Sequence, residues 1–286
     1  MSSGVYFTYK GILLPVRELK EETVKYVENE FQVRDDDIFN VTYPKSGTNW
    51  MSEILGLIRN DGDPSWIRSL TVFDRTPWIE TDHGLETALK YPPPRLISTH
   101  LQIQLFPKSF FHSKAKVIYT LRNPKDVLVS HYHFSKIFKL WKDLGTMEEL
   151  LKDFLSGNVP FGSWFDHVKG WLPMKDRDNV FFITYEELQQ DLRGSVERIC
   201  HFLGKELNSQ QIDSVVENAS FQKMKDNKMS NFTIVGESYI DHEKGKLLRK
   251  GISGDWKNHL TVAQSELFDH VYQENMRGVS MTFPWD

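Results

Sequence analysis

The sequence predicts an α/β fold, in which a central, mostly parallel sheet is flanked by helices within a single domain over residues 1–286. Runs of β-forming residues alternate along the chain with longer segments of helical periodicity. Strands that alternate with helices typically build a parallel sheet that is covered on both faces. The chain also has the length of one large domain, and it contains no internal repeat and no Gly/Ser-rich linker.

Each expected element is justified by its composition and by the residues that bound it. Runs of β-formers predict strands over residues 37–43, 95–99, 116–121 and 180–184. Apolar residues at helical spacing predict helices over residues 48–60 and 186–202. Pro44 ends the first strand, while Asn123 and Pro124 suit the N-cap and the first turn of a helix after the third strand. Gly204 can cap the last helix.

Composition narrows the range of functions. Lys and Arg number 35 against 39 Asp and Glu, a net charge of -4, whereas nucleic-acid-binding domains are usually basic. We therefore expect any anionic ligand to be held by a few local cations. The single cysteine, Cys200, excludes an intramolecular disulfide, and no metal-ligand spacing is found. Without a membrane-length apolar run or a signal peptide at Met1, we expect a soluble, cytoplasmic protein with no membrane or nucleic-acid partner.

Four polar residues follow the four expected strands. Lys45 follows the first strand, His100 the second, Arg122 the third and Tyr185 the fourth. In an open α/β sheet, the ligand crevice lies at the carboxyl ends of the strands. Because packing alone does not explain the coincidence, the four residues predict a binding site at this edge of the sheet.

The turn between the first strand and its helix has the chemistry of a phosphate loop. Lys45 supplies a cation, Gly47 permits close backbone approach, and the N–H groups at the start of the helix can point at an anion. The turn is not a Walker A motif, which needs a glycine well before the lysine. The structural alternative is an ordinary strand-to-helix turn that is capped by Ser46 or Thr48.

Two long motifs resemble the signatures of the cytosolic sulfotransferases. Residues 42–50 (TYPKSGTNW) resemble the 5′-phosphosulfate loop of that family, and residues 249–259 (RKGISGDWKNH) resemble the signature that holds a 3′-phosphate. The resemblance covers essentially the whole chain, with further similar blocks at residues 106–111, 162–167 and 184–188. Within the family, the chain is most similar to the hydroxysteroid (alcohol/sterol) subfamily, notably at residues 62–69 and 276–285.

The resemblance implies the donor 3′-phosphoadenosine 5′-phosphosulfate (PAPS), the product adenosine 3′,5′-bisphosphate (PAP), and no metal. It assigns the donor site to Lys45, Ser46, Gly47, Thr48, Asn49, Trp50, Arg122, Ser130, Tyr185, Ser220, Phe221, Met224, Arg249, Lys250 and Gly251. Trp50 and Phe221 would sandwich the adenine. Singly, these residues have structural alternatives, because aromatic residues fill cores, helix serines such as Ser130 bond to the preceding turn, and most basic pairs are solvated.

The resemblance also implies catalysis by His100, Lys45 and Ser130. A neutral imidazole can take the proton of an acceptor alcohol as the new S–O bond forms, and a lysine cation can neutralise charge on the leaving phosphate. We expect in-line transfer, with catalysis mostly by positioning and electrostatics. Without this resemblance, a lone histidine is more often a structural residue.

The subfamily resemblance and the aromatic residues predict a 3β-hydroxysteroid or sterol as acceptor. The acceptor is expected to contact Phe73, Trp78, His100, Phe134 and Phe138. Gln102 and Phe73 depart from the family pattern, and so do His131 and His133, which leaves the exact acceptor open. The two histidines do not share a helix face as metal ligands would, so we expect them in the substrate pocket or at the surface.

Residues 257–266 (KNHLTVAQSE) resemble the family's K-x-x-x-T-V-x-x-x-E dimer motif, so a homodimer is expected, although an exposed helix start capped by Thr261 fits equally well.

Two other functions stay open at this point. A nucleotide-dependent phosphotransferase would need Mg²⁺, normally held by an acidic residue at a strand end. A non-catalytic steroid-binding protein would need neither phosphate clamp nor His100.

Overall fold

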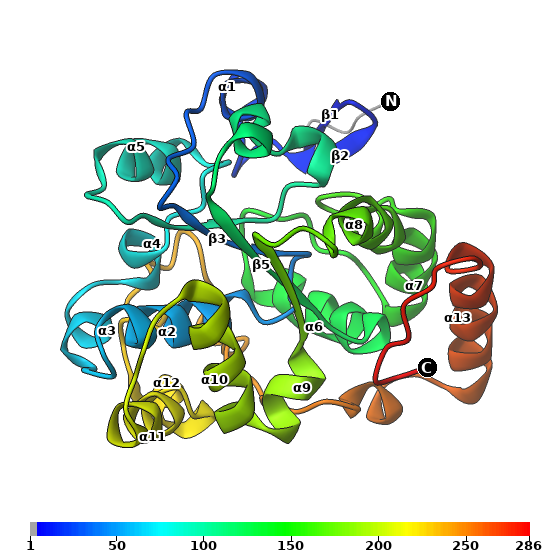
Figure 1. Ribbon diagram of the computed structural model, residues 1–286. Helices are drawn as coiled ribbons and strands as arrows, with labels where there is room; N and C mark the ends of the chain where they lie inside the picture. Colours follow the sequence, from blue (N-terminus) through cyan, green and yellow to red (C-terminus); the bar gives the residue numbers. More distant parts are fainter. Residues whose placement is uncertain (1–4) are drawn as a thin grey trace.

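The central sheet has four parallel strands in the order β4-β3-β5-β6, which confirms the predicted fold class. The computed structural model describes residues 5–286, and Figure 1 shows helices on both sides of the sheet. The four strands are β3 (Ile38–Thr42), β4 (Leu96–Thr99), β5 (Lys116–Leu121) and β6 (Val180–Thr184). An antiparallel hairpin of β1 (Tyr6–Tyr9) and β2 (Ile12–Pro15) precedes them and was not predicted.

Helices connect the strands and cover both faces of the sheet. The first half of the chain contains α1 (Glu21–Asn29), α2 (Thr48–Arg59), α3 (Ser65–Ser69), α4 (Val72–Arg75), α5 (Asp82–Lys90) and α6 (Pro124–Ile137), with short 3-10 turns η1 (Ile103–Leu105) and η2 (Lys108–His112). The second half contains α7 (Met147–Ser156), α8 (Trp164–Trp171), η3 (Leu172–Met174), α9 (Tyr185–Gln190), α10 (Leu192–Leu203), α11 (Ser209–Asn218), α12 (Phe221–Asp226), η4 (Asp255–Asn258) and α13 (Val262–Asn275). Within residues 5–286, no helix has the length and apolarity needed to cross a membrane.

Apolar side chains on the two faces of the sheet belong to two separate cores. Successive side chains of a strand point to opposite faces, and β5 follows this rule. Val117 and Tyr119 pack into a core with α1, α6 and α8. Ile118 packs into a second core with α2, α10 and α11. The strands are therefore buried on both faces, as parallel strands usually are.

Most predicted boundaries agree with the structure, but the helix predicted over residues 186–202 is wrong. Asn123 caps α6 by accepting a hydrogen bond from the Lys125 N–H, and Gly204 ends α10 in the left-handed conformation. The predicted helix is broken at Asp191, which has φ −147° and accepts a hydrogen bond from the Gly194 N–H. Asp191 therefore ends α9 and serves as the N-cap of α10. Its short carboxylate accepts a hydrogen bond from a backbone N–H at the start of α10, which favours a non-helical conformation at Asp191 itself.

Candidate active site

The strand register brings the four predicted strand-end residues to one edge of the sheet. Val41 lies opposite Thr99, and Leu121 lies opposite Thr184, so the carboxyl ends of neighbouring strands are level. Lys45, His100, Arg122 and Tyr185 all line one cavity of about 760 Å³, which confirms the predicted crevice. This volume is within the usual range for small-molecule sites.

The cavity gathers nearly all the predicted donor and acceptor residues. Those that line it are Lys45, Gly47, Thr48, Asn49, Trp50, Phe73, Trp78, His100, Arg122, Ser130, Phe134, Phe138, Tyr185, Phe221, Met224, Arg249, Lys250 and Gly251. Ser46 and Ser220 are not among the lining residues. Ser46 is buried, and its hydroxyl has no partner among residues 5–286. Ser220 caps α12 by accepting a hydrogen bond from the Lys223 N–H.

The turn between β3 and α2 leaves the helix N-terminus open to a ligand. Gly47 is the N-cap with φ 106°, and no side chain caps the first turn, so Ser46 and Thr48 do not act as the caps of the structural alternative. A Cβ at Gly47 would lie 2.8 Å from the Tyr185 ring, which explains the glycine. The uncapped backbone N–H groups of α2 and its dipole favour an anion here.

Lys45 is a largely buried cation beside this turn. Its Nζ lies 3.6 Å from the centroid of the Phe134 ring. Within the described chain, no carboxylate lies within 4 Å of it. Burial, aided by repulsion from Arg122, lowers the pKa of Lys45 to about 7. A buried cation that faces another cation instead of an acid indicates a site for an anionic ligand.

Arg122 is fixed at the end of β5 by backbone contacts. Its guanidinium donates to the carbonyls of Lys45 and Ile252, at 3.1 Å each, and lies 4.2 Å from the Tyr185 ring centroid. Its Nε is buried without a hydrogen-bond partner among residues 5–286. Arg122 is thus held in place while its Nε–H stays available to donate a hydrogen bond to a ligand.

Arg249 and Lys250 are tied to a buried carboxylate that the sequence analysis did not assign a role. Asp255 accepts from the Arg249 guanidinium and from the Lys250 ammonium, at 2.6 Å each. Burial raises the pKa of Asp255, but the bonds from Lys250, Asn258 and Arg249 outweigh burial and lower it. The two cations are therefore oriented, and they are not a freely solvated pair.

His100 is held as a neutral imidazole. Its Nδ1 lies 2.9 Å from the carbonyl oxygen of Thr42, which can only accept, so Nδ1 carries the hydrogen. Its Nε2 therefore has the lone pair, and it accepts a hydrogen bond from Trp78 Nε1 at 3.1 Å. Burial lowers the pKa of His100 to about 4, which keeps the ring neutral near pH 7. The lone pair of Nε2 is the proton acceptor that a general base needs.

A buried hydrogen-bond network lies behind His100. Glu80 accepts from the His100 backbone N–H at 2.8 Å, and His167 Nε2 lies 3.1 Å from the His100 carbonyl oxygen. His167 is in turn 2.7 Å from the hydroxyl of Tyr119 on β5. None of these three was predicted. For Glu80 and Tyr119 the sequence signal is a polar residue in a segment that otherwise packs into the core, and His167 also lies in the family-like block 162–167.

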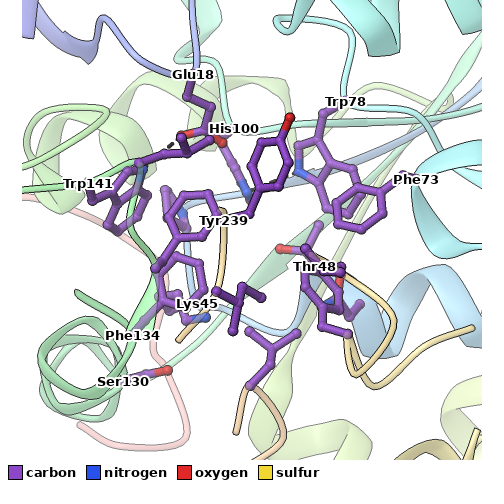
Figure 2. Close-up of a pocket in the computed structure, with 18 of the residues that line it drawn as sticks. Glu18, Lys45, Thr48, Phe73, Trp78, His100, Ser130, Phe134, Trp141 and Tyr239 are labelled. Carbon is purple, nitrogen blue, oxygen red and sulfur yellow. Dashed lines mark hydrogen bonds between the residues drawn. The ribbon is translucent and has the colours of Figure 1, made fainter. Parts of the chain in front are cut away.

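Aromatic residues form the remaining wall of the cavity. Phe134 and Phe138 stack at 4.7 Å, and Phe73 lies 5.6 Å from Trp78. Figure 2 shows Phe73, Trp78 and Phe134 around His100 and Lys45, together with Tyr239. The predicted acceptor residues are therefore adjacent to the proposed base. Many lining residues were missed, among them Glu18, Trp141 and Tyr239.

The prediction that His131 and His133 lie in the substrate pocket or at the surface is wrong for His131. That residue is fully buried and stacks on Tyr43, with ring centroids 5.6 Å apart. His133 is half-buried against His259 and is not among the cavity-lining residues. In the part of the chain that the structure describes, no group of three or more His, Cys, Asp or Glu residues is placed to hold a metal ion.

Comparison with known proteins identifies the family. Residues 35–280 match the model of the sulfotransferase domain. The chain belongs to the sulfotransferase family. Mouse sulfotransferase 2B1 is 59% identical over 283 residues, which cover 99% of this chain and 83% of that protein. Human sulfotransferase 2A1 is 49% identical over 285 residues, which cover 99% of this chain and 100% of that protein. The 3-beta-hydroxysteroid sulfotransferase of Cavia porcellus is 48% identical, covering 97% of each chain.

Solved structures confirm the fold of this sulfotransferase. A crystal structure of mouse sulfotransferase 7A1 complexed with PAP has a TM-score of 0.80 and 33% identity, and covers 96% of this chain and 95% of that one. Retinol dehydratase complexed with androsterone and PAP has a TM-score of 0.86 at 23% identity, and the match covers 98% of this chain and 91% of that one. At this level of identity, the likeness shows the fold alone. The predicted hydroxysteroid sulfotransferase subfamily is confirmed, and the phosphotransferase and non-catalytic alternatives are set aside.

Proposed function

We propose that this sulfotransferase moves the sulfuryl group of PAPS to the hydroxyl of a 3β-hydroxysteroid or sterol. The observation that carries the proposal is the position of His100, which lines the same cavity as Lys45 and Arg122 and whose Nε2 is bound to Trp78 of the aromatic wall. The names of the relatives support this acceptor, since one of them is a 3-beta-hydroxysteroid sulfotransferase. A rigid apolar ring system gains about 25 cal/mol per Å² when it is buried against such a wall.

Unsatisfied polar groups at the phosphate turn fit the donor. The Arg122 Nε is buried without a hydrogen-bond partner among residues 5–286, and the same guanidinium is bound to the Lys45 carbonyl. The Ser46 hydroxyl, in the turn just before the uncapped start of α2, is also without a partner among these residues. Lys45 to Trp50 would hold the 5′ end of the donor. Arg122 and Ser130, together with Arg249, Lys250 and Gly251, would hold its 3′-phosphate. Bound there, the donor supplies the sulfuryl group that is transferred.

The chemistry then requires a proton acceptor and a cation. His100 Nε2 takes the proton of the acceptor hydroxyl, and the Thr42 carbonyl stabilises the imidazolium that forms, because it accepts the Nδ1 hydrogen. Lys45 provides positive charge where negative charge develops on the leaving group. The Trp78 indole N–H already donates a hydrogen bond to His100 Nε2. This bond must break, or the lone pair must be shared, before the acceptor hydroxyl can donate to the same nitrogen.

A sulfate-transfer assay with labelled PAPS tests the proposal. We expect dehydroepiandrosterone, pregnenolone and cholesterol to exceed a simple phenol and an arylamine in kcat/KM. His100→Ala should lower kcat by roughly 10²–10⁴ while affinity for PAP stays nearly unchanged, as for loss of a general base. His201→Ala, at an exposed position of α10, is the matched control. A phenol or amine that outpaces every steroid would refute the acceptor class, and full activity in His100→Ala would refute the base.

A further inference from the structure

Glu18 is an acidic residue that lines the cavity beside Trp141. It lies in the loop between β2 and α1 and is among the lining residues. One carboxyl oxygen, Oε2, accepts a hydrogen bond from Trp141 Nε1 at 2.7 Å, the bond drawn as a dashed line in Figure 2. For the described residues, Oε1 has no hydrogen-bond partner and no Lys, Arg or His nitrogen lies within 4 Å of the carboxyl.

The cations nearest to Glu18 in sequence also line the cavity but are bound elsewhere. Lys20 pairs with Asp82 at 2.5 Å, and Arg17 donates to the carbonyl of Lys139 at 3.3 Å. Two acids lie near this site: Glu80 repels Glu18, and Asp82, which also lines the cavity, is paired with Lys20. Glu18 is therefore an acid without a compensating cation, and it keeps one acceptor oxygen for the contents of the cavity.

A partly buried carboxyl that faces the cavity with an unused oxygen is costly to ionise. Burial raises the pKa of Glu18 to about 7, although the bond from Trp141 opposes the shift. A ligand that donates a hydrogen bond to Oε1 removes this cost, whereas a ligand carbonyl at the same place is repelled by the ionised carboxylate. If this position only contacted the apolar carbon atoms of a steroid, an apolar side chain would be more favourable. The carboxyl instead favours a ligand group that donates a hydrogen bond.

We propose that Glu18 selects acceptors that carry a second hydrogen-bond donor, such as a second hydroxyl, in addition to the hydroxyl that receives the sulfuryl group. This inference rests on the proposed function, because it takes the cavity to be the acceptor site. Glu18 is here a specificity residue and takes no part in proton transfer.

A purely structural role for Glu18 makes a different prediction. Trp141 is 5% exposed, so its indole N–H needs an acceptor whether or not a ligand binds. Glu18→Gln keeps that acceptor through its amide oxygen and keeps the size of the side chain. It also turns an N–H donor toward the place of Oε1. If Glu18 only supported Trp141, the variant would leave the choice between acceptors unchanged.

The test compares 3β-hydroxysteroid pairs that differ only in a second oxygen, hydroxyl or ketone, at carbon 7, 17 or 20. At pH 8.5, where the Glu18 carboxyl is ionised, we expect wild type to favour the hydroxyl member of at least one pair by ~10-fold or more in kcat/KM. Glu18→Gln should remove or reverse that preference, and Glu18→Leu should remove it. Glu22→Gln, at an exposed position of α1, should keep it.

The outcomes separate the two proposals. Unfolding in the presence of PAP first establishes that every variant is folded and binds the donor. Equal kcat/KM within every pair, or the same ratio in wild type and Glu18→Gln, would overturn the role of Glu18 while steroid sulfation stands. Absence of transfer to any steroid by the PAP-binding wild type would overturn the proposed acceptor class, and the role of Glu18 with it.

Discussion

Lys45 makes the affinity for PAP depend on pH. Burial and the nearby Arg122 lower the pKa of Lys45 to about 7 in the ligand-free protein, against an ordinary value near 10.5. An anionic phosphate beside the ammonium group restores its pKa toward the ordinary value. Binding of PAP therefore takes up a proton at any pH above about 7, and affinity falls as the pH rises.

The size of the effect follows from this single titration. If the bound form stays protonated, Kd rises in proportion to 1 + 10^(pH − pKa), which is about 2 at pH 7 and about 100 at pH 9. The expected increase in Kd between these values is roughly 50-fold, or about 2.3 kcal/mol. The stability of the ligand-free protein depends on pH in the opposite direction. Between pH about 7 and about 10.5, Lys45 is protonated in the unfolded chain but largely neutral in the folded protein, so the free energy of unfolding rises with pH.

Isothermal titration with PAP at pH 7, 8 and 9 measures the effect, and two buffers of different ionisation enthalpy report the proton uptake. The phosphates of PAP are already ionised in this range, since their second pKa is near 6. Lys45→Arg is the matched control, because a guanidinium stays charged and its Kd should be nearly independent of pH. A wild-type Kd that changes less than about threefold, or an equal slope in Lys45→Arg, would refute the argument.

Three further predictions concern other parts of the molecule. Arg249→Ala should weaken PAP binding by ~2–5 kcal/mol in calorimetry, and unchanged affinity would contradict the second clamp. Trp78→Phe should lower the acceptor KM by ~2–10-fold in steady-state assays, because His100 Nε2 loses a competing donor; a raised KM would show that the indole assists binding. Sedimentation at micromolar concentration should show a dimer that Val262→Glu dissociates, since Val262 is 75% exposed; a wild-type monomer would count against the motif.

Part of the donor half could be predicted from the strands alone. Lys45 and Gly47 come shortly after β3, and Arg122 directly after β5, so parallel pairing brings them together. The donor residues on α12 and at 249–251 follow no strand, and only the family resemblance indicated them. The role of Asp255 was not predicted, although it lies within the second motif, because the choice of ion-pair partners depends on the conformation of a loop. Glu18 has no local signal at all, since a glutamate in a loop is normally solvated.

The failure at His131 has a simple geometric reason. Consecutive residues of a helix point about 100° apart, so only one of two neighbours on α6 can face the cavity. Ser130 lines the cavity, and His131 therefore turns into the core against Tyr43. A sequence shows that the helix exists, but the direction of each side chain depends on how the helix is rotated against the sheet.

The acceptor wall differs from the donor half in how it is attached to the fold. Two isolated bridges fix its segments to rigid elements: Trp78 pairs with Ser98 on β4, and Phe138, after α6, pairs with Ile240. Substitutions within these loops can therefore change the acceptor without disturbing the sheet. His100 joins the two halves, since its Nδ1 is bound by Thr42 of β3 and its Nε2 by Trp78 of the acceptor wall. The proton acceptor is thus held by the strands, while the choice of alcohol is left to loop residues such as Glu18.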